Sequence, residues 1–310
     1  MSVTSSSSSQ VYDTIIECIS EAQSNSIEAQ EKALQTLASI TKVNPKNRNF
    51  LAQIDGAITT LATLTNSPSP IIQTLSLLTL FNLSLNPNLK PSLADMQTIH
   101  HLNSRITSSL SSSPPDSCKL ASSLICSLAM HDKNKAKFGV AGTVQLLVKA
   151  IKDSPRDFHH HLLSSLAELV QFHGNCTVAV RSGAVPALLG VVKETSDEDL
   201  ASTSLVILGL LARFEEGLNG LKKSKEIVSD MLFVLKGRSM LSKEGAVDIL
   251  LRLLDDDCEG FVSEVMLLPE FAMAVADLSV RGSARVRGKA DLVMKKMAEV
   301  TLISDVEQWI

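Results

Sequence analysis

The chain is poor in aromatic residues and in the residues that break regular structure. Aromatics are 4% of its 310 residues, and Gly and Pro number 14 and 10. That Gly and Pro content is too low for a collagen-like or low-complexity protein. Apolar residues nevertheless make up 45%, so a core must be built from Leu, Ala, Val and Ile. Such side chains favour helix-on-helix packing, in which many small dispersion contacts add up.

A strong charge of one sign is also absent. The formal net charge is −4, from 29 basic and 33 acidic residues, which gives no field that would favour nucleic acid or an anionic membrane. No apolar run reaches the roughly 18 residues that would span a bilayer. The polar, Ser-rich start lacks the apolar centre of a secretory signal. We therefore expect a monomer in the cytoplasm, the nucleus or both, with no membrane insertion and no nucleic-acid partner.

Motifs for catalysis or metal binding are missing as well. The five cysteines are odd in number and widely spaced, which is typical of reduced thiols. No HExxH, GxSxG, paired CxxC or GxGxxG pattern occurs. His159, His160 and His161 are consecutive and so point about 100° apart on a helix, whereas a helical metal site needs ligands one turn apart. We interpret them as a solvated helix start. The sequence predicts no catalytic residue, no cofactor and no metal.

A Gly-led helix start recurs along the chain. Gly142, Gly183 and Gly245 each precede a short stretch with apolar residues on one helix face, and Gly56 precedes a looser copy. Polar turns with Asn fall into the same rhythm, at steps of 41, 46, 41 and 44 residues. The Asn series is Asn47, Asn88, Asn134, Asn175 and Asn219. A period of roughly 40 to 47 residues is typical of HEAT and armadillo (ARM) repeats.

Between these blocks lie apolar helices, each preceded by a helix breaker rich in Ser, Asp or Pro. Such residues cap a helix with a side-chain oxygen or fix its first φ. After Pro155, apolar residues recur at offsets 0, 1, 4, 7 and 8, which is one face of an α-helix. They are Leu162, Leu163, Leu166, Leu169 and Val170. A single unit of this kind cannot bury its apolar face alone, whereas stacked neighbours can.

These patterns predict an all-α protein, a right-handed α-solenoid of about six ARM-type repeats with a C-terminal cap helix. The expected segments are a disordered Ser-rich tail, the solenoid and a C-terminal tail, at residues 1–10, 11–300 and 301–310. Gly183 and Gly245 are 62 residues apart, which breaks the period and predicts an insertion or irregular repeat at about 216–240. The basic residues of the cap helix, at 284–300, fit a solvated outer face.

Two blocks resemble the armadillo repeats of plant U-box ubiquitin ligases. The first is Leu80-Phe-Asn-Leu-Ser-Leu-Asn86 with Asn88, Lys90 and Leu93-Ala94 after it, and the second runs from Asn134 to Leu147. The resemblance covers about residues 11–300 and implies the ARM fold. No U-box pattern occurs in the short stretch before the first clear repeat helix, so the ligase activity of that family is not carried over.

In armadillo proteins the third helix of each repeat lines a concave groove, and the resemblance implies that a partner binds there. Nuclear-import receptors carry an Asn ladder in this groove, with Trp one turn earlier to stack on Lys stems. The matching positions here, aligned on Asn82, hold one Asn and no Trp, because the single Trp is Trp309. An import-receptor function is therefore not expected. We predict that a protein partner contacts a polar, partly acidic ladder of Ser39, Asn82, Cys126, Glu168 and Asp277.

Three functions stay open on these grounds. The first is a non-catalytic scaffold or adaptor that binds a partner protein on the concave face of the solenoid. The second is a regulator or substrate-binding component in ubiquitination, related to U-box ARM proteins but lacking the catalytic module. The third is an enzyme with an unrecognised site, which would need a nucleophile–base pair that no motif provides. The sequence favours the first.

Overall fold

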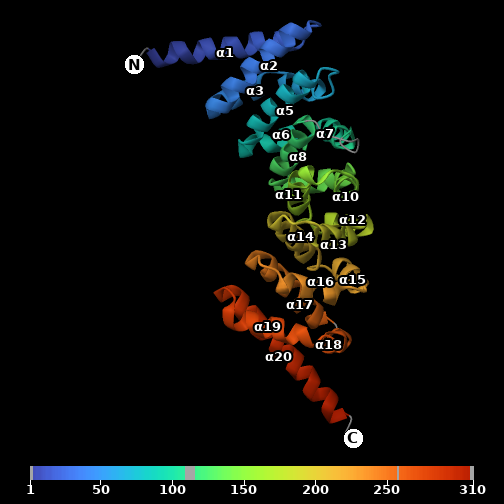
Figure 1. Cartoon of the computed structure of the whole chain (residues 1–310). Helices are drawn as coiled ribbons and strands as arrows, with labels where there is room; N and C mark the ends of the chain where they lie inside the picture. The colour runs from blue at the N-terminus through green and yellow to red at the C-terminus, as the bar shows by residue number, and fades with distance from the viewer. Residues whose placement is uncertain (1–2, 109–115, 257, 308–310) are drawn as a thin grey trace. The chain divides into compact units, whose positions relative to one another are not determined.

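The computed structural model describes residues 3–108, 116–256 and 258–307, and the regular elements among them are helices. The helices form two compact units, residues 1–175 and 176–310. Within each unit the helices follow one another in sets of three, and the third helices of neighbouring sets pack together (Figure 1). In the described residues the eighteen α-helices from α3 to α20 make six such sets. The predicted all-α solenoid of about six repeats is confirmed.

Unit 1 begins with a helix pair, whose two members pack in the places of a second and a third helix, and continues with three sets. The pair is α1 (Val3–Ala22) and α2 (Ile27–Val43). The first set is α3 (Pro45–Gln53), α4 (Ala57–Leu64) and α5 (Pro70–Ser84). The second is α6 (Lys90–Leu93), α7 (Met96–Ser108) and α8 (Asp116–Ala129), with the 3-10 helix η1 (Pro87–Leu89) before it. The third is α9 (Asp132–Val140), α10 (Thr143–Asp153) and α11 (His159–Leu169), with η2 (Arg156–Phe158) before α11.

Unit 2 contains the remaining sets. The first is α12 (His173–Arg181), which crosses the boundary between the units, α13 (Ala184–Glu194) and α14 (Glu198–Leu211). The second is α15 (Glu215–Lys222), α16 (Ile227–Lys236) and α17 (Met240–Asp256). The last is α18 (Cys258–Met266), α19 (Pro269–Arg281) and α20 (Ala284–Glu307). The third helices α14, α17 and α20 contact one another in that order.

Local sequence explains where the helices begin. Side-chain oxygens of Ser26, Ser69 and Asp197 accept hydrogen bonds from backbone N–H groups in the first turns of α2, α5 and α14. These N–H groups have no partner inside the helix, so the caps stabilise the helix starts. The turn from a first to a second helix uses left-handed backbone, with φ of 78° to 84°, at the predicted junction glycines Gly56, Gly142 and Gly183.

Of the two alternatives predicted at 216–240, the structure shows an irregular repeat and not an insertion. The segment contains α15 and α16, the first and second helices of a set. Gly245, expected as a fourth junction glycine, lies inside the third helix α17. The junction that leads into α16, from Lys223 to Glu226, turns without a positive φ. A repeat without the junction glycine was therefore hidden from a search that relied on that residue.

The predicted disordered tail is wrong for the part that the structure describes, because residues 3–10 belong to α1. Later turns of α1 bury Ile15 and Ile19. Extending an established helix costs far less than nucleating one, so weak helix formers such as Ser can continue it. In the same way residues 301–307 extend α20. The segments outside the described residues are 1–2, 109–115, 257 and 308–310, which includes Trp309.

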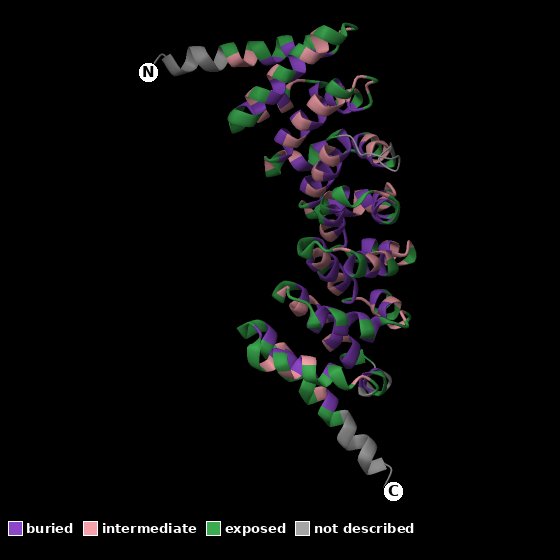
Figure 2. Ribbon diagram, viewed as in Figure 1, coloured by how far each residue is buried: buried purple, intermediate pink, exposed green. Residues whose placement is uncertain are grey.

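The core of both units is aliphatic. The predicted apolar stripe after Pro155 is fully buried, at Leu162, Leu163, Leu166, Leu169 and Val170. Figure 2 shows the buried residues along the sides where helices meet, with exposed residues on turns and outward faces. Burial contributes roughly 1.5–3 kcal/mol for each Leu, Ile or Val removed from water. Contacts within a set and between neighbouring sets therefore both stabilise the fold, as expected of a repeat array.

No single helix within the described residues is both long and apolar enough to cross a membrane. The helices α12 and α13, which meet at 74°, satisfy the length and composition criteria only when they are taken together.

The recurring Asn joins a first helix to the helices before it at Asn47, Asn134 and Asn175, while Asn88 is exposed. Asn175 Nδ2 on α12 donates to the carbonyls of Lys135 and Leu169, both at 2.9 Å. Asn134 Nδ2 on α9 makes the same pair of bonds to the preceding set, at 3.0 and 3.1 Å. One acceptor of each pair, Leu169 or Leu128, lies at the end of a third helix, where carbonyls have few partners, so the amide adds a bond between two helices there. The regular spacing of these Asn residues therefore reflects the packing of one set against the next.

Unit 2 has a glycine at the equivalent place. Gly217, 42 residues after Asn175, lies so close to the backbone carbonyl of Leu211 that a Cβ would overlap it. Asn219, which continued the Asn series in the sequence, is exposed two positions later. The helix α15 thus packs directly against the end of α14, with no amide between them.

The predicted cap helix is α20, the third helix of the last set. Its basic side chains do not form the purely solvated face that was expected. Lys289 Nζ lies 2.6 Å from an oxygen of Asp248 and 3.1 Å from an oxygen of Glu244, both on α17. Lys296 Nζ lies 2.5 Å from Asp255. A row of ion pairs therefore joins α20 to α17.

Candidate protein-binding site

Three of the predicted contact residues lie on the third helices of unit 1. Ser39 is on α2, Cys126 on α8 and Glu168 on α11, and these helices contact in order through α5. Ser39 is exposed, while Cys126 and Glu168 are half-buried. Their side chains can therefore reach a partner on this row of helices. That they bind one stays a prediction.

Asn82, the fourth predicted residue, points inward. Its side chain is buried on α5, and Nδ2 donates to the carbonyl of Ala38 at 3.0 Å and to Oγ1 of Thr41 at 3.1 Å. Both acceptors belong to α2, the third helix of the preceding set. The amide therefore holds two third helices together, and its nitrogen is not available to a partner's backbone. The family pattern placed an Asn here without showing which way it points.

Asp277, the fifth residue, does not belong to a third helix. It lies on α19, the second helix of its set, which packs against α16 and α20. Its carboxylate is 3.3 Å from Nε of Arg281, one turn later. Asp277 was assigned to a third helix because Gly245 was taken as the start of a second helix. Gly245 lies inside the third helix α17, so the helices after it were given the wrong places in their set. The five predicted residues therefore do not form one ladder.

A cavity of about 310 Å³ lies among the third helices α5, α8 and α11. Volumes near 300 Å³ are at the small end of ligand sites, which leaves room for one or two bulky side chains. Cys126 is the one predicted contact residue in its wall. We call this site the unit 1 cavity and define it by Phe81, Leu85, Cys126, Met130, His161 and Ser164.

The polar groups in this wall carry no charge near neutral pH. Burial, and then the charge of Glu168, raises the pKa of the Cys126 thiol to about 11, so it stays protonated and is a poor nucleophile. Burial lowers the pKa of His161 below its usual value, which keeps the imidazole neutral. A protonated thiol, a thioether and an aromatic ring form a soft surface that suits apolar side chains.

Ser123 and His161 form the kind of pair that an enzyme would need. Ser123 Oγ and His161 Nδ1 are 3.0 Å apart, across α8 and α11. A serine nucleophile also needs donors for the oxyanion, but Ser123 lies in the middle of α8, where backbone N–H groups are used within the helix. We therefore interpret the pair as a hydrogen bond that ties two third helices together.

One buried cation lies behind the cavity wall. Lys90 is buried, and its Nζ donates to the carbonyl of Ser127 at 2.7 Å. Burial lowers the pKa of Lys90, while Cys126 and Glu168 act in the opposite direction. The negative charge of Glu168 acts on this cation, so the two charges partly offset each other. The cavity is therefore suited to an uncharged group.

Exposed apolar side chains follow the ends of the third helices. Leu85 and Met130 come directly after α5 and α8, and Phe172 follows α11 by three residues; their exposed fractions are 48%, 62% and 43%. Leu85 and Met130 also line the unit 1 cavity. Single exposed apolar residues are common, but a group beside a concave site is typical of interaction surfaces. The cavity and its rim together make the strongest candidate site in unit 1.

Sequence reasoning missed most of this cavity. The expected solvated start at His159–His161 holds only for His160, because His159 is buried with Nε2 3.2 Å from the Ser154 carbonyl, and His161 is half-buried in the wall. The sequence did contain a signal for these residues, since Ser164 and His161 lie one and two turns before Glu168 and so share its helix face.

Within the described residues no group of three or more His, Cys, Asp or Glu is placed to hold a metal.

Comparison with known proteins gives relatives by sequence but no family model that matches. U-box domain-containing protein 8 of Arabidopsis thaliana is 26% identical over 245 residues, which is 79% of this chain and 62% of the relative. U-box domain-containing protein 1 of Medicago truncatula is 29% identical over 116 residues, 37% of this chain and 17% of the relative. The chain therefore spans less than two thirds of the length of these relatives.

Solved structures agree on the fold. An engineered protein is similar with a TM-score of 0.75 at 16% identity, over 93% of this chain and 72% of that protein. A designed armadillo repeat protein in complex with the peptide (KR)4 is similar with a TM-score of 0.67 at 15% identity, over 76% of this chain and 98% of the design. The chain therefore has the armadillo-repeat fold, an all-α solenoid, and its sequence is similar to that of plant U-box domain-containing proteins.

Proposed function

We propose that the chain is a non-catalytic adaptor that binds a segment of another protein on the third helices of unit 1. A bulky apolar side chain of that segment would occupy the unit 1 cavity. The observation that carries this proposal is an uncharged cavity with Leu85 and Met130 exposed at its rim. Burying one such side chain contributes roughly 1.5–3 kcal/mol, which is enough for a specific anchor.

Polar contacts would flank the anchor. Glu168 is half-buried on α11, and its Oε2 accepts a hydrogen bond from Gln171 Nε2 at 3.3 Å. A carboxylate has several acceptor sites, so Glu168 can also receive an N–H group or a basic side chain of the segment. Ser39, exposed on α2, is the second polar candidate. Both remain proposals.

Selection from a library of random peptides tests the adaptor proposal. Met130→Glu places a charge at the rim, and Val140→Glu is the matched control, since Val140 is 83% exposed on α9 and does not line the cavity. Peptides selected on the wild type should share a bulky apolar residue and bind Met130→Glu about tenfold or more weakly, because burying a charge beside it is costly.

Val140→Glu should bind the same peptides as tightly as the wild type does. Both variants should keep the helical circular dichroism of the wild type, since both replace exposed side chains. Equal binding by the two variants would place the partner elsewhere on the chain and would contradict the proposal.

Similarity to U-box domain-containing proteins favours a second candidate, a regulator or substrate-binding component in ubiquitination. Under this proposal the chain, added to a reconstituted reaction of a plant U-box ligase, would bind the conjugating enzyme or a substrate and change the rate of ubiquitin transfer. Met130→Glu should then remove the change. A transfer rate that is indifferent to the chain at saturating concentration would argue against this role.

A further inference from the structure

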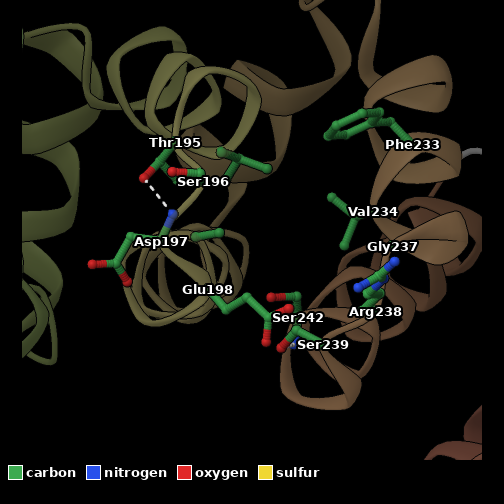
Figure 3. A pocket seen from close by; sticks show the side chains of 12 residues that line it. Thr195, Ser196, Asp197, Glu198, Phe233, Val234, Gly237, Arg238, Ser239 and Ser242 are labelled. Atoms are coloured by element: carbon green, nitrogen blue, oxygen red, sulfur yellow. Dashed lines mark hydrogen bonds between the residues drawn. The ribbon is translucent and has the colours of Figure 1, made fainter.

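A smaller cavity lies in unit 2, between the turns that lead into two neighbouring third helices (Figure 3). One side is the turn into α14, and the other is the end of α16 with the turn into α17. Its volume is about 150 Å³, compared with about 310 Å³ for the unit 1 cavity. That space is too small for a helix or a nucleotide and is sufficient for one amino-acid side chain.

The cavity has an apolar wall and a polar end. Phe233 and Val234 form the wall on α16, and Phe233 is unusually exposed for an aromatic residue, at 61%. Figure 3 shows Glu198 pointing toward Ser239 and Ser242, while Arg238 lies beside Gly237 on the opposite side. An occupant would therefore place an apolar stem against the ring and a polar head beside Glu198. We call this site the unit 2 cavity.

Most polar groups around the cavity already have partners. Asp197 Oδ1 accepts from the backbone N–H groups of Asp199 and Leu200 at 2.9 and 3.2 Å, as the cap of α14. The hydroxyls of Ser242 and Ser202 are 2.9 Å apart and buried. Among the described residues, the structure gives the Glu198 carboxylate no hydrogen bond or ion pair. A carboxylate that lines the same cavity as an exposed aromatic ring is therefore left available to a ligand.

Charge around the cavity favours a cation. The turn into α14 carries Glu194, Asp197, Glu198 and Asp199 within six residues. The nearby Lys193 is held by Glu226 and Asp230, at 2.6 and 2.8 Å, and so does not neutralise this turn. Arg238 is the one basic residue in the cavity lining, and it lies across from the acidic turn.

We propose that the unit 2 cavity binds a lysine side chain of a partner protein. Its methylene stem would lie along Phe233 and Val234, and its ammonium group would contact Glu198. Long basic side chains bury their stems against apolar surface while the charge stays near water, and an ammonium group is also attracted to an aromatic face. A compact ammonium fits a cavity of this volume. The proposal uses none of the residues of the unit 1 cavity and does not depend on it.

Titration of the full-length chain tests this proposal by NMR of its valine methyl groups and phenylalanine rings. The probe is the peptide acetyl-Ala-Ala-Lys-Ala-Ala-amide, and the controls carry Nε-acetyllysine or glutamate in place of lysine. The lysine peptide should give saturable shifts at Val192, Val234 and Phe233. The acetylated control should bind about tenfold more weakly, because a hydrogen bond to a charged group contributes more than one between neutral groups.

Two variants decide which charge is responsible. Glu198→Gln keeps the shape and removes the charge, and it should weaken the lysine peptide about tenfold. Arg238→Ala should leave binding unchanged or tighten it. Three results would overturn the proposal: no saturable shift at the cavity, unchanged binding by Glu198→Gln, or a preference for the glutamate peptide that Arg238→Ala removes.

Discussion

The two units join their neighbouring sets of helices by different chemistry. In unit 1 the bonds between sets are mostly uncharged, such as Ser84 Oγ to Ser127 Oγ at 2.8 Å and Asn82 to the end of α2. Even the buried Lys90 donates to a carbonyl. In unit 2 the corresponding bonds include ion pairs, such as Lys289 with Asp248 and Lys193 with Asp230. Helices of the same fold are thus held by two kinds of interaction.

This difference has physical consequences. Buried amide and hydroxyl bonds are costly to break, because an unpaired polar group stays behind, but they do not respond to pH. Ion pairs between partly exposed side chains contribute less each and weaken with salt and acid. In a repeat array each set depends mainly on its neighbours. We therefore expect the stability of unit 2 to respond to salt and pH more strongly than that of unit 1.

The largest effect should come from Gly217→Ala in unit 2. The new Cβ would overlap the backbone carbonyl of Leu211, which cannot rotate away as a side chain could. Overpacking of this kind costs about 3 kcal/mol, and α15 should separate from α14. Hydrogen exchange resolved by peptide should show faster exchange in α15 and α14, and urea unfolding should show the loss of free energy.

Gly288→Ala is the matched control for this change. Gly288 is exposed in α20, and an added Cβ meets nothing within 4 Å. The substitution should stabilise the helix by about 0.5–1 kcal/mol, because Ala loses less backbone entropy than Gly. If both variants behaved alike, the close packing of α15 on α14 would be refuted.

A smaller loss of stability is expected at Asn175, whose side-chain amide occupies the place that Gly217 has in unit 2. Asn175→Ala removes two hydrogen bonds from its amide, to the carbonyls of Lys135 and Leu169, and should cost about 2 kcal/mol, at about 1 kcal/mol for each bond. Gly139→Ala should cost about 1–2 kcal/mol, because its Cβ would displace the Asn175 side chain. The double variant should lose about 1 kcal/mol less than the sum, since the two changes disrupt one contact. Strict additivity in urea unfolding would show that Gly139 and Asn175 act separately.

The fold was predictable from the sequence because the period is carried by residues with a fixed physical role. Gly142 and Gly183 adopt the left-handed backbone that their junction requires, and Asn134 and Asn175 bond to the set before them. Where a close backbone approach replaces the amide, at Gly217, the pattern disappears from the sequence while the set of helices remains. The repeat that was missed lies there.

The candidate site was less predictable, because a ladder position fixes only which helix a residue is on. Asn82 and Cys126 occupy equivalent positions, yet one is buried against α2 and the other lines a cavity. Whether such a side chain points inward depends on the neighbouring helix, here on Thr41 as an acceptor. Cavities arise from three helices at once, so the wall formed by His161 and Met130 could not be read from one of them.

The smallest expected effect is a difference between the two units in how their stability depends on pH. A hydrogen bond from Lys193, and then its charge, lowers the pKa of Glu226 below its ordinary 4.5. A carboxyl with a lowered folded-state pKa adds stability that is complete above its unfolded pKa and is lost as the pH falls through the folded value. The gap in urea midpoint between wild type and Glu226→Gln should therefore be present at neutral pH and close as the pH falls below 4.5 and through the lowered folded pKa of Glu226. Asn86→Ala removes the uncharged bond to Asn49 in unit 1, at 2.6 Å, and its gap should not depend on pH. A gap that closes equally for both variants would mean that charge does not distinguish the two units.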